Sequence, residues 1–409
     1  MDQSTVSASQ LDARLGAPTF ADDPYPIFAG LRAVAPVHRS EAWGFWVVTR
    51  YADVTTILRD PRRFSNVGRS AAVERVPDEQ RIRLGPMFDS FRVGMPSSDP
   101  PAHTRLRTLI NKTLTTSRVE AMAPRIQAIF DGLLDGIANT SRTDLIATLA
   151  YPFPAIVLAE LVGLPTADRE RFKAWSGDII ALHSTGRPDP AAAETAWIAW
   201  QAARDWLVGL MADRRDHPED DVMSILVNAR VDGDVLSDVE ILSTLVTLMT
   251  AGHETTTGLI GNGILALLTH PDQLTRLRDD ASLIDAAVDE VLRFESPFPR
   301  AWRRTTMAVE LSGVVIPTEA IVSASLASAN RDPEQFPDAD RFDVTRRPNR
   351  HVGLGGGIHF CLGAPLAKLE GQVAIGSLVR RLPRLALDGR PTWQPSITHH
   401  VLQTLPVRW

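Results

Sequence analysis

The chain has 409 residues, of which 44% are hydrophobic, so it is long enough to bury a large core. Its formal net charge is −6 and it has no long run of Lys or Arg, which argues against a nucleic-acid partner. It has neither 18 consecutive apolar residues nor the charged start and apolar run of a signal peptide, so we expect no membrane span and a cytoplasmic location.

The spacing of apolar residues predicts a mainly helical chain with short strands near both ends. A helix is expected from Asp23 to about Val34, and a buried strand over 45–49. Residues 60–100 are expected to be irregular because Pro, Gly and Arg are frequent there, and helical periodicity dominates afterwards. Disorder is allowed for in about residues 1–17.

Two of the predicted helices have definite ends. One begins after Ser237, which stands three residues before a Glu as in a capping box, and runs to about Leu268 before Pro271. At 1.5 Å per residue its length would be about 45–50 Å, so much of this helix must be buried. The other runs over about 283–294.

The rest of the chain predicts short strands and one more helix. Residues 309–326 alternate like strands broken by Gly and Pro, and the tail over 385–409 is strand-like. A helix is expected after Cys361, through about Leu382. We find no repeat or linker, so a single domain over residues 1–409 is predicted.

Cys361, the only cysteine, follows a glycine-rich stretch, Gly353-Leu354-Gly355-Gly356-Gly357-Ile358-His359-Phe360. Most lone cysteines are inert core residues. Glycines, however, let the backbone approach a flat ligand, and the N–H groups at a helix start stabilise the thiolate that an iron ligand requires. One alternative is a buried thiol in a glycine-rich turn. The other is a phosphate-binding loop, but the Lys-Ser/Thr that ends such a loop does not follow Gly363. Zinc and iron–sulfur sites would need further cysteines.

The stretch resembles the haem-binding loop of the cytochrome P450 family, Phe-Gly-x-Gly-x-His-x-Cys-x-Gly. The matching residues are Gly355, Gly357, His359, Cys361 and Gly363. The resemblance implies a single-domain P450 fold, mainly α with small β-sheets. In that fold haem b lies between a long central helix and the start of the cysteine-bearing helix, and Cys361 is the iron's proximal ligand. Leu354 departs from the usual Phe, which removes an aromatic ring near the sulfur and bears on the redox potential.

Glu290 and Arg293 share one face of the predicted helix 283–294, so they can form an ion pair. From these residues alone, a solvated pair of little consequence is the alternative. In the P450 family this pair is buried and is locked by a third charged residue in a later loop. Asp340-Arg341-Phe342 matches that loop, so the resemblance implies a structural triad with Arg341.

The long helix contains Ala251-Gly252-His253-Glu254-Thr255-Thr256. Glycine weakens a helix and threonine competes for its hydrogen bonds, so a local distortion is expected, with a helix–helix contact through small residues as the alternative. The segment resembles the P450 oxygen pocket, which implies that Ala251 and Gly252 border the haem and O2. Glu254 and Thr255 would then deliver protons. A His-Glu-x-x-His zinc site is excluded by Thr257.

Haem carries two propionates, which require cations when they are buried. The run from Asp99 resembles the family's propionate-binding helix start, and it places His103 and Arg107 on one helical face. Arg303 matches a family position on a strand beside the haem, and His359 completes the set. Each alone is more often a surface charge, but beside the cysteine loop all four are predicted propionate ligands.

The resemblance also implies a substrate pocket on the distal side of the haem. Its expected lining is apolar or small: Phe88, Phe91, Thr247, Thr250, Ala251, Phe298 and Pro299. Such a lining favours an apolar organic substrate of small to medium size. Arginines between positions 62 and 92 could receive an anionic group, although exposure to solvent is the stronger interpretation.

Taken together, these motifs imply a haem-thiolate monooxygenase that inserts one oxygen atom of O2 into a C–H bond, by hydroxylation, O-dealkylation or epoxidation. Electrons are expected from a separate ferredoxin and ferredoxin reductase, with Lys112, Arg350 and Lys368 as basic contacts or merely solvated charges. The protein is expected to be a monomer. A peroxide-driven peroxygenase, against which the pair Glu254-Thr255 argues, and a non-catalytic haem-binding protein stay as alternatives.

Overall fold

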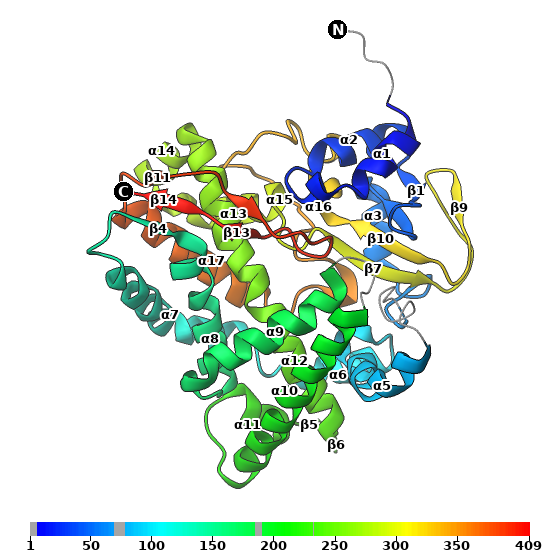
Figure 1. The fold of residues 1–409 in the computed structure, drawn as a ribbon, viewed down its shortest axis with the longest axis vertical. Coiled ribbons are helices and arrows are strands. Elements are labelled where there is room, and N and C mark those ends of the chain that lie inside the picture. The colour runs from blue at the N-terminus through cyan, green and yellow to red at the C-terminus, as the bar shows by residue number, and fades with distance from the viewer. Residues whose placement is uncertain (1–5, 69–77, 185–189, 232) are drawn as a thin grey trace.

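The computed structural model describes residues 6–68, 78–184, 190–231 and 233–409 (Figure 1). Helices make up most of it, so the predicted mainly α class with small sheets is confirmed. The α-helices are α1 (Ala8–Leu15), α2 (Tyr25–Val34), α3 (Tyr51–Arg59), α5 (Asp78–Val93), α6 (Ala102–Ile110), α7 (Thr116–Gly136), α8 (Pro152–Val162), α9 (Arg169–Ser184), α10 (Pro190–Asp216), α11 (Val222–Val227), α12 (Asp238–Gly252), α13 (Glu254–Thr269), α14 (Pro271–Asp279), α15 (Ile284–Phe294), α16 (Leu326–Ala329) and α17 (Ala364–Arg381). Shorter turns are the 3-10 helices η1 (Pro18–Ala21), η2 (Met95–Ser97), η4 (Thr166–Asp168), η5 (Ala281–Leu283) and η6 (Gly357–His359), and the π-helix η3 (Ile146–Ala150).

Five short strands from both halves of the chain form the main sheet. Its strand order is β1 (Val37–Arg39), β2 (Trp46–Val48), β10 (Ile321–Ser325), β7 (Arg300–Thr305) and β3 (Phe64–Ser65). β10 is parallel to β2 and antiparallel to β7, and Ser325 lies opposite Arg300. The predicted strand at 45–49 therefore pairs with one of the strands predicted over 309–326.

The remaining strands form small sheets. They are β4 (Arg142–Asp144), β5 (Arg230–Val231), β6 (Asp234–Val235), β8 (Val309–Leu311), β9 (Val314–Ile316), β11 (Ala386–Leu387), β12 (Thr392–Trp393), β13 (Leu402–Thr404) and β14 (Pro406–Arg408). β14 pairs with both β4 and β11, and β12 pairs with β13. The strand-like pattern of the C-terminal tail is thus confirmed.

The segment 1–17, in which we allowed for disorder, contains the helix α1, which packs beside the main sheet. A capping box begins α1 at Ser7, and Leu11 and Leu15 are 2% and 1% exposed. They pack with α2 and the neighbouring strands, and this burial stabilises a helix that is too short to form alone. Residues 1–5 lie outside the described part of the chain.

The interval 60–100 contains a helix, α5, where we expected irregular structure. Pro86 lies inside α5, and a proline in a helix removes one backbone hydrogen bond, so the sequence argued against this element. Phe88 and its neighbours are buried against the helical core, and this packing outweighs the local penalty. Residues 69–77 of the interval lie outside the described residues.

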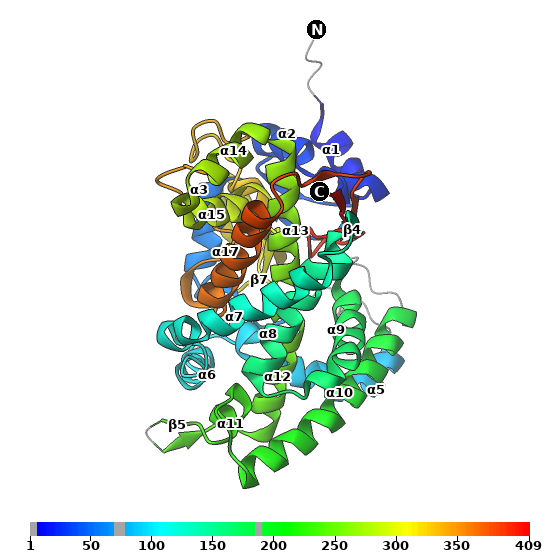
Figure 2. The same ribbon diagram turned by 90° about the vertical axis from the view of Figure 1, so that its left-hand side faces the viewer.

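The predicted long helix over 236–268 is present as two consecutive helices, α12 and α13, that meet at His253 (Figure 2). The predicted capping box is confirmed, since Ser237 accepts from the Glu240 backbone N–H and the Glu240 carboxylate accepts in return. The break falls inside the segment where glycine and threonine predicted a distortion. Both helices are largely buried, as their length requires.

α13 packs against both α15 and α17, and α17 is the helix that follows the cysteine loop (Figure 2). The contact is close because glycines face the neighbouring helices. A Cβ added to Gly263 would lie 2.8 Å from Ile375 on α17, and one added to Gly371 would lie 3.0 Å from Leu259. This packing fixes the distance between the break in the central helix and the cysteine loop.

Candidate active site

Two positions of the glycine-rich loop require glycine. Gly355 and Gly357 have φ of +73° and +64°, in the left-handed region that favours glycine. In addition, a Cβ on Gly357 would collide with the carbonyl of Leu58 on α3, so the loop can sit this close to α3 only without a side chain. The third glycine predicted here, Gly363, precedes α17 and has φ of −82°.

Cys361 is held by the backbone of this loop. Its N–H donates to the Leu354 carbonyl at 3.0 Å, and α17 begins three residues later, at Ala364, rather than at the cysteine itself. Burial raises the pKa of the Cys361 thiol, while the Gly363 backbone N–H and the Arg107 guanidinium act in the opposite direction. Coordination removes the proton from such a thiol, so Cys361 would serve as a thiolate ligand despite its raised pKa.

The predicted propionate ligands lie around this loop. The rings of His103 and His359 are 4.3 Å apart between centroids, and Arg107 Nη1 donates to the Phe360 carbonyl at 3.0 Å. His103 is 3% exposed, and its Nε2 has no hydrogen-bond partner within the described residues. One arginine and two histidines, from α6 and the loop, therefore converge beside Cys361.

Arg303 comes from a different element, β7. It is 4% exposed and donates to the Trp302 carbonyl at 2.7 Å. Because side chains alternate along a strand, Arg303 faces the same side of the sheet as Ala301, which packs with α3. α3 is also the helix that the cysteine loop contacts at Leu58.

His253 fixes the break between α12 and α13. Its ring Nδ1 lies 2.8 Å from the Met249 carbonyl, and its Nε2 lies 3.3 Å from the Tyr151 hydroxyl. The ring thus bonds the carbonyl that a helix would normally bond through the backbone N–H of residue 253. Burial lowers the pKa of His253 to about 4, so the ring stays neutral and Nδ1 can donate at neutral pH.

Glu254 and Thr255 follow directly on α13. The Thr255 hydroxyl donates to the Ala251 carbonyl at 2.8 Å, which leaves its oxygen free to accept. The Glu254 carboxyl bonds to the Gln394 side chain, and burial raises its pKa. Its Oε2 has no hydrogen-bond partner in the part of the chain that the structure describes. The pair therefore places a carboxyl with a raised pKa one residue from a hydroxyl whose oxygen can still accept a hydrogen bond.

The two small residues before the break face different surroundings. Gly252 contacts α8, since a Cβ there would lie 2.9 Å from Leu158, and this is the helix–helix contact considered as the alternative. Ala251, in contrast, is exposed although it lies in the central helix. Ala251 is therefore the residue of this segment with surface available for a ligand.

The predicted pocket residues come from three elements. Phe88 and Phe91 lie on α5, and Phe298 and Pro299 lie between α15 and β7. On α12, Thr247 and Thr250 are partly buried, and their hydroxyls donate to the Ser243 and Val246 carbonyls at 2.7 and 2.9 Å. Because these hydroxyls are satisfied within the helix, the threonines present a less polar surface than their sequence suggests.

Sequence reasoning missed the loop between β12 and β13. Gln394 from this loop contacts Glu254, and the ring of His399 lies 5.8 Å from that of Phe298. This segment is about 140 residues from Glu254 in the chain, and nothing local marks it as part of the site. The backbone path places it there, since a Cβ on Gly258 of α13 would lie 2.8 Å from Val401.

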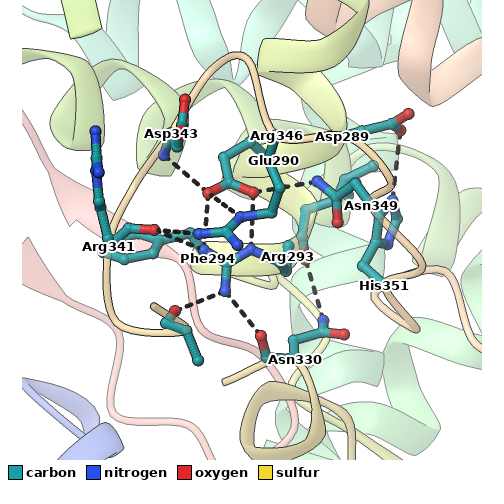
Figure 3. A network of polar contacts seen from close by, with 12 residues as sticks. Asp289, Glu290, Arg293, Phe294, Asn330, Arg341, Asp343, Arg346, Asn349 and His351 are labelled. Carbon is teal, nitrogen blue, oxygen red and sulfur yellow. Dashed lines mark hydrogen bonds and ion pairs between the residues drawn. The ribbon is translucent and has the colours of Figure 1, made fainter. Parts of the chain in front are cut away.

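Glu290 and Arg293 form a fully buried pair, as predicted (Figure 3). Arg293 binds both oxygens of Glu290 at 2.7 Å, and its remaining donors reach the carbonyls of Asn330, Ala339 and Arg341 at 2.7–2.9 Å. Burial lowers the pKa of Arg293, against the effect of the Glu290 charge. All five guanidinium N–H groups therefore have acceptors.

The third charged member of this network is Arg346, so the prediction of Arg341 is wrong. Arg346 Nε lies 3.2 Å from Glu290 Oε1, and Asn349 donates to Oε2 at 3.1 Å. Arg341 offers only its carbonyl, and its guanidinium points away from Glu290 (Figure 3). Both arginines lie in one loop, and the turn of the backbone decides which side chain points inward.

This network also supports the cysteine loop. Asn330, whose carbonyl binds Arg293, accepts the Val352 N–H through Oδ1 at 2.8 Å. One residue later, Gly353 lies so close to the Leu292 carbonyl that any side chain would collide with it. The buried ion pair therefore positions the start of the loop that carries Cys361.

These residues fit a haem group. The partly buried Cys361 thiol would ligate the iron, and His103 Nε2, which has no partner among the described residues, would bind a carboxylate together with Arg107. A Cβ added at Gly363 would meet no atom within 4 Å, and Ala251 is exposed, so these two residues have open space beside them in which a flat macrocycle would lie. None of the helices in the described ranges has the length and hydropathy needed to cross a bilayer.

Comparison with known proteins gives one consistent result. The family model for cytochrome P450 matches residues 45–407. The cytochrome P450 monooxygenase PikC of Streptomyces venezuelae is 41% identical, with 99% of this chain and 95% of that protein covered. The vitamin D(3) 25-hydroxylase of Pseudonocardia autotrophica is also 41% identical, with 95% and 93% covered. The structure of P450BioI in complex with an acyl carrier protein carrying hexadec-9Z-enoic acid has a TM-score of 0.89 at 34% identity, with 96% of this chain and 100% of that chain covered.

The matched region includes the break in the central helix, the buried Glu290–Arg293 pair and the cysteine loop, and it extends almost to the C-terminus. Relatives above 30% identity over nearly the whole chain show the family as well as the fold. The chain therefore belongs to the cytochrome P450 family, and it is a monooxygenase with a haem cofactor.

Proposed function

We propose that this P450 uses haem b to hydroxylate an apolar substrate of small to medium size, with electrons from a separate ferredoxin and its reductase. The observation that carries the proposal is the Glu254-Thr255 pair. This pair follows the helix break at which the His253 ring bonds to the Met249 carbonyl, and it lies beside the exposed Ala251. Such a pair suits activation of O2, which consumes protons, more than use of peroxide. O-dealkylation or epoxidation would follow from the same chemistry on other substrates.

Bound haem supplies the redox chemistry that splits O2 and delivers one oxygen atom to the substrate. Cys361 would ligate the iron and donate electron density from its thiolate, which the Gly363 N–H and Arg107 stabilise. His103, Arg107, Arg303 and His359 would bind the propionates. The first two converge with His359 beside the loop, and Arg303 approaches from the sheet.

Protons would pass through Glu254 and Thr255. Because burial raises the pKa of Glu254, the carboxyl holds its proton to a higher pH than an exposed glutamate does. The Thr255 hydroxyl, anchored to Ala251, can accept a hydrogen bond on one side while it donates on the other. Gln394 would orient the carboxyl, which makes it a positioning residue.

An apolar substrate is supported by the pocket lining and by the relatives. Phe88 and Phe91 are aromatic, and the hydroxyls of Thr247 and Thr250 bond to their own helix. The name of one relative records a hydroxylase of vitamin D(3), and the P450BioI structure carries a fatty acyl chain. Both are largely apolar molecules, and the likeness supports the class without selecting a compound.

Two of the three basic residues considered for ferredoxin docking are already engaged. Lys368 Nζ lies 2.5 Å from Asp289, and Lys112 donates to the Arg230 carbonyl at 3.1 Å. Arg350, in contrast, is exposed. Arg350 would therefore contact an acidic ferredoxin directly. The protein itself would be a cytoplasmic monomer.

Replacing Thr255 with Ala is the experiment that tests this function. We expect intact haem binding and an intact substrate-induced spin shift, but reducing equivalents diverted to peroxide, with product per electron pair falling at least about tenfold because a proton relay is lost. The measurement is product and peroxide formed per nicotinamide oxidised, with surrogate ferredoxin and reductase.

The matched control is Thr256→Ala, because its hydroxyl also bonds to its own helix, at the Gly252 carbonyl. It should leave coupling unchanged. Unchanged coupling in Thr255→Ala would refute the assigned role. Product formed with peroxide and none with the ferredoxin system would instead identify a peroxygenase.

The pH dependence of coupled turnover should report Glu254. Burial raises its pKa, so the folded protein loses this proton, and with it coupled turnover, as the pH rises through the raised value. In Glu254→Gln we expect this dependence to disappear and turnover to fall on the order of 10²-fold, as for loss of a general acid. Glu319→Gln, an exposed site, serves as control, and a wild-type profile in Glu254→Gln would contradict the prediction.

A further inference from the structure

Arg300 is a buried cation outside the haem site. It begins β7 and is 1% exposed. Side chains alternate along a strand, so Arg300 and Trp302 share the face of the main sheet that the N-terminal segment covers, whereas Arg303 lies on the other face. In Figure 1 this face lies beside α1 and α2. Arg300 therefore plays no part in the propionate set.

Aromatic rings surround the guanidinium of Arg300. Its Cζ lies 4.2 Å from the centroid of the Trp43 ring, 5.8 Å from that of Phe20 and 6.0 Å from that of Trp302. Cation–π attraction stabilises the charge in such a setting. Ring faces, however, do not replace the in-plane acceptors that the five N–H groups of a guanidinium require.

Those acceptors are missing among the described residues. Nε, Nη1 and Nη2 of Arg300 all lack a hydrogen-bond partner there, and so do the buried hydroxyls of Ser323 and Ser325. Ser325 lies directly opposite Arg300 in the sheet, and Ser323 lies opposite Trp302, so both serines share the face of Arg300. One face of the sheet thus gathers a cation and two hydroxyls with unmet hydrogen-bonding capacity.

Arg293 shows how unusual this is within the same protein. It is equally buried, yet a carboxylate and three carbonyls satisfy all its donors. At Arg300 no carboxylate of the described residues opposes the effect of burial, which lowers the pKa to about 9 and still leaves the group charged at neutral pH. A buried charge without a counter-charge is strongly unfavourable, so a stable fold calls for an anion here.

We propose that Arg300, Ser323 and Ser325 bind one small monovalent inorganic anion of the halide class, enclosed between the main sheet and the N-terminal segment. One cation favours a single negative charge, and two hydroxyls and a guanidinium supply only donors toward it. The enclosure by Phe20, Trp43 and Trp302 favours a compact ion over an oxyanion such as phosphate.

Because Phe20 and Trp43 belong to the N-terminal segment, the bound ion holds that segment to the sheet. A ligand that binds only the folded state stabilises it, and the stabilisation grows with ligand concentration above Kd. Chloride should therefore stabilise the protein through this site in a way that is independent of haem chemistry and of turnover.

The test compares thermal unfolding of the haem-loaded protein in sodium chloride and in sodium gluconate at equal ionic strength. We expect the wild-type Tm to rise with chloride concentration relative to gluconate, and this chloride-dependent shift to be lost in Arg300→Met. Arg304→Met is the matched control. It lies on the same strand but bonds to the Gly68 carbonyl and Glu319, so it should keep the shift. An equal shift in wild type and Arg300→Met overturns the proposal.

Bromide provides a second, structural test on the wild-type protein. Crystals grown in bromide should show an anomalous peak beside the Arg300 guanidinium and the two serine hydroxyls. Water or no density at that position overturns the proposal, whatever the salt dependence. If Arg300→Met fails to fold, Ser325→Ala replaces it, with a weakened chloride shift expected and an unchanged one counting against the site.

Discussion

Replacing Cys361 with Ser is expected to abolish monooxygenase turnover and to leave the fold intact. Cys361 is the only cysteine of the chain, so no other thiolate can ligate the iron. Its loop is shaped by backbone hydrogen bonds and by the left-handed glycines Gly355 and Gly357, none of which involves the sulfur. A hydroxyl donates far less electron density than a thiolate, and that density favours cleavage of the O–O bond.

The measurement combines product formation with the absorption spectrum of the reduced carbon monoxide complex. We expect product at background and a spectrum that no longer has thiolate character. The matched control is Phe360→Ala, because Phe360 precedes the cysteine and is 46% exposed. It should keep the thiolate spectrum. A thiolate-type spectrum in Cys361→Ser would show that the ligand has been misassigned.

Arg293→Met is expected to have the largest effect on stability, about 3–5 kcal/mol of the free energy of unfolding, because it leaves the buried Glu290 carboxylate without its main partner. The substitution also removes hydrogen bonds outside the Glu290–Arg293 pair. Arg293 also holds the carbonyls of Asn330 and Ala339, and Asn330 in turn binds the start of the cysteine loop at Val352. We therefore also expect weaker retention of haem.

Urea unfolding of this variant and two others tests the assignment of the third charge. Arg346→Ala should destabilise the protein by an intermediate amount, because Arg346 binds Glu290 and three loop carbonyls. Arg341→Ala is the control, and a change within about 0.5 kcal/mol is expected for an exposed side chain. Equal losses in the two alanine variants would contradict the network in Figure 3.

Local signals were enough for several elements. The capping box at Ser237 and the apolar periodicity over 283–294 predicted helix positions to within a few residues, since both act within one or two turns. The cysteine loop was equally local. Its glycines, Cys361 and the start of α17 lie within a dozen residues, and a side chain at Gly357 is forbidden by both the backbone angle and Leu58.

Elements whose stability comes from distant partners were not predicted. α1 and α5 carry weak or contradictory local signals, Pro86 among them, and both are held by burial against other helices or the sheet. The same holds for Gln394, which reaches Glu254 only because the C-terminal strands cross α13. Long-range contacts of this kind produce no periodic pattern of apolar residues in the segments that make them, so the sequence does not reveal them.

The sequence by itself was enough to predict the family and its monooxygenase chemistry, because the cysteine loop and the Glu254-Thr255 pair are recognised from residue type and short spacing. The tertiary structure alone decided three further matters: that Arg346 rather than Arg341 completes the buried network, that Gly252 packs on Leu158, and that Arg300 is enclosed with no counter-charge from the residues that the structure describes. Each depends on which face of a loop, helix or strand meets another segment. That contact follows from packing between segments that are far apart in the sequence.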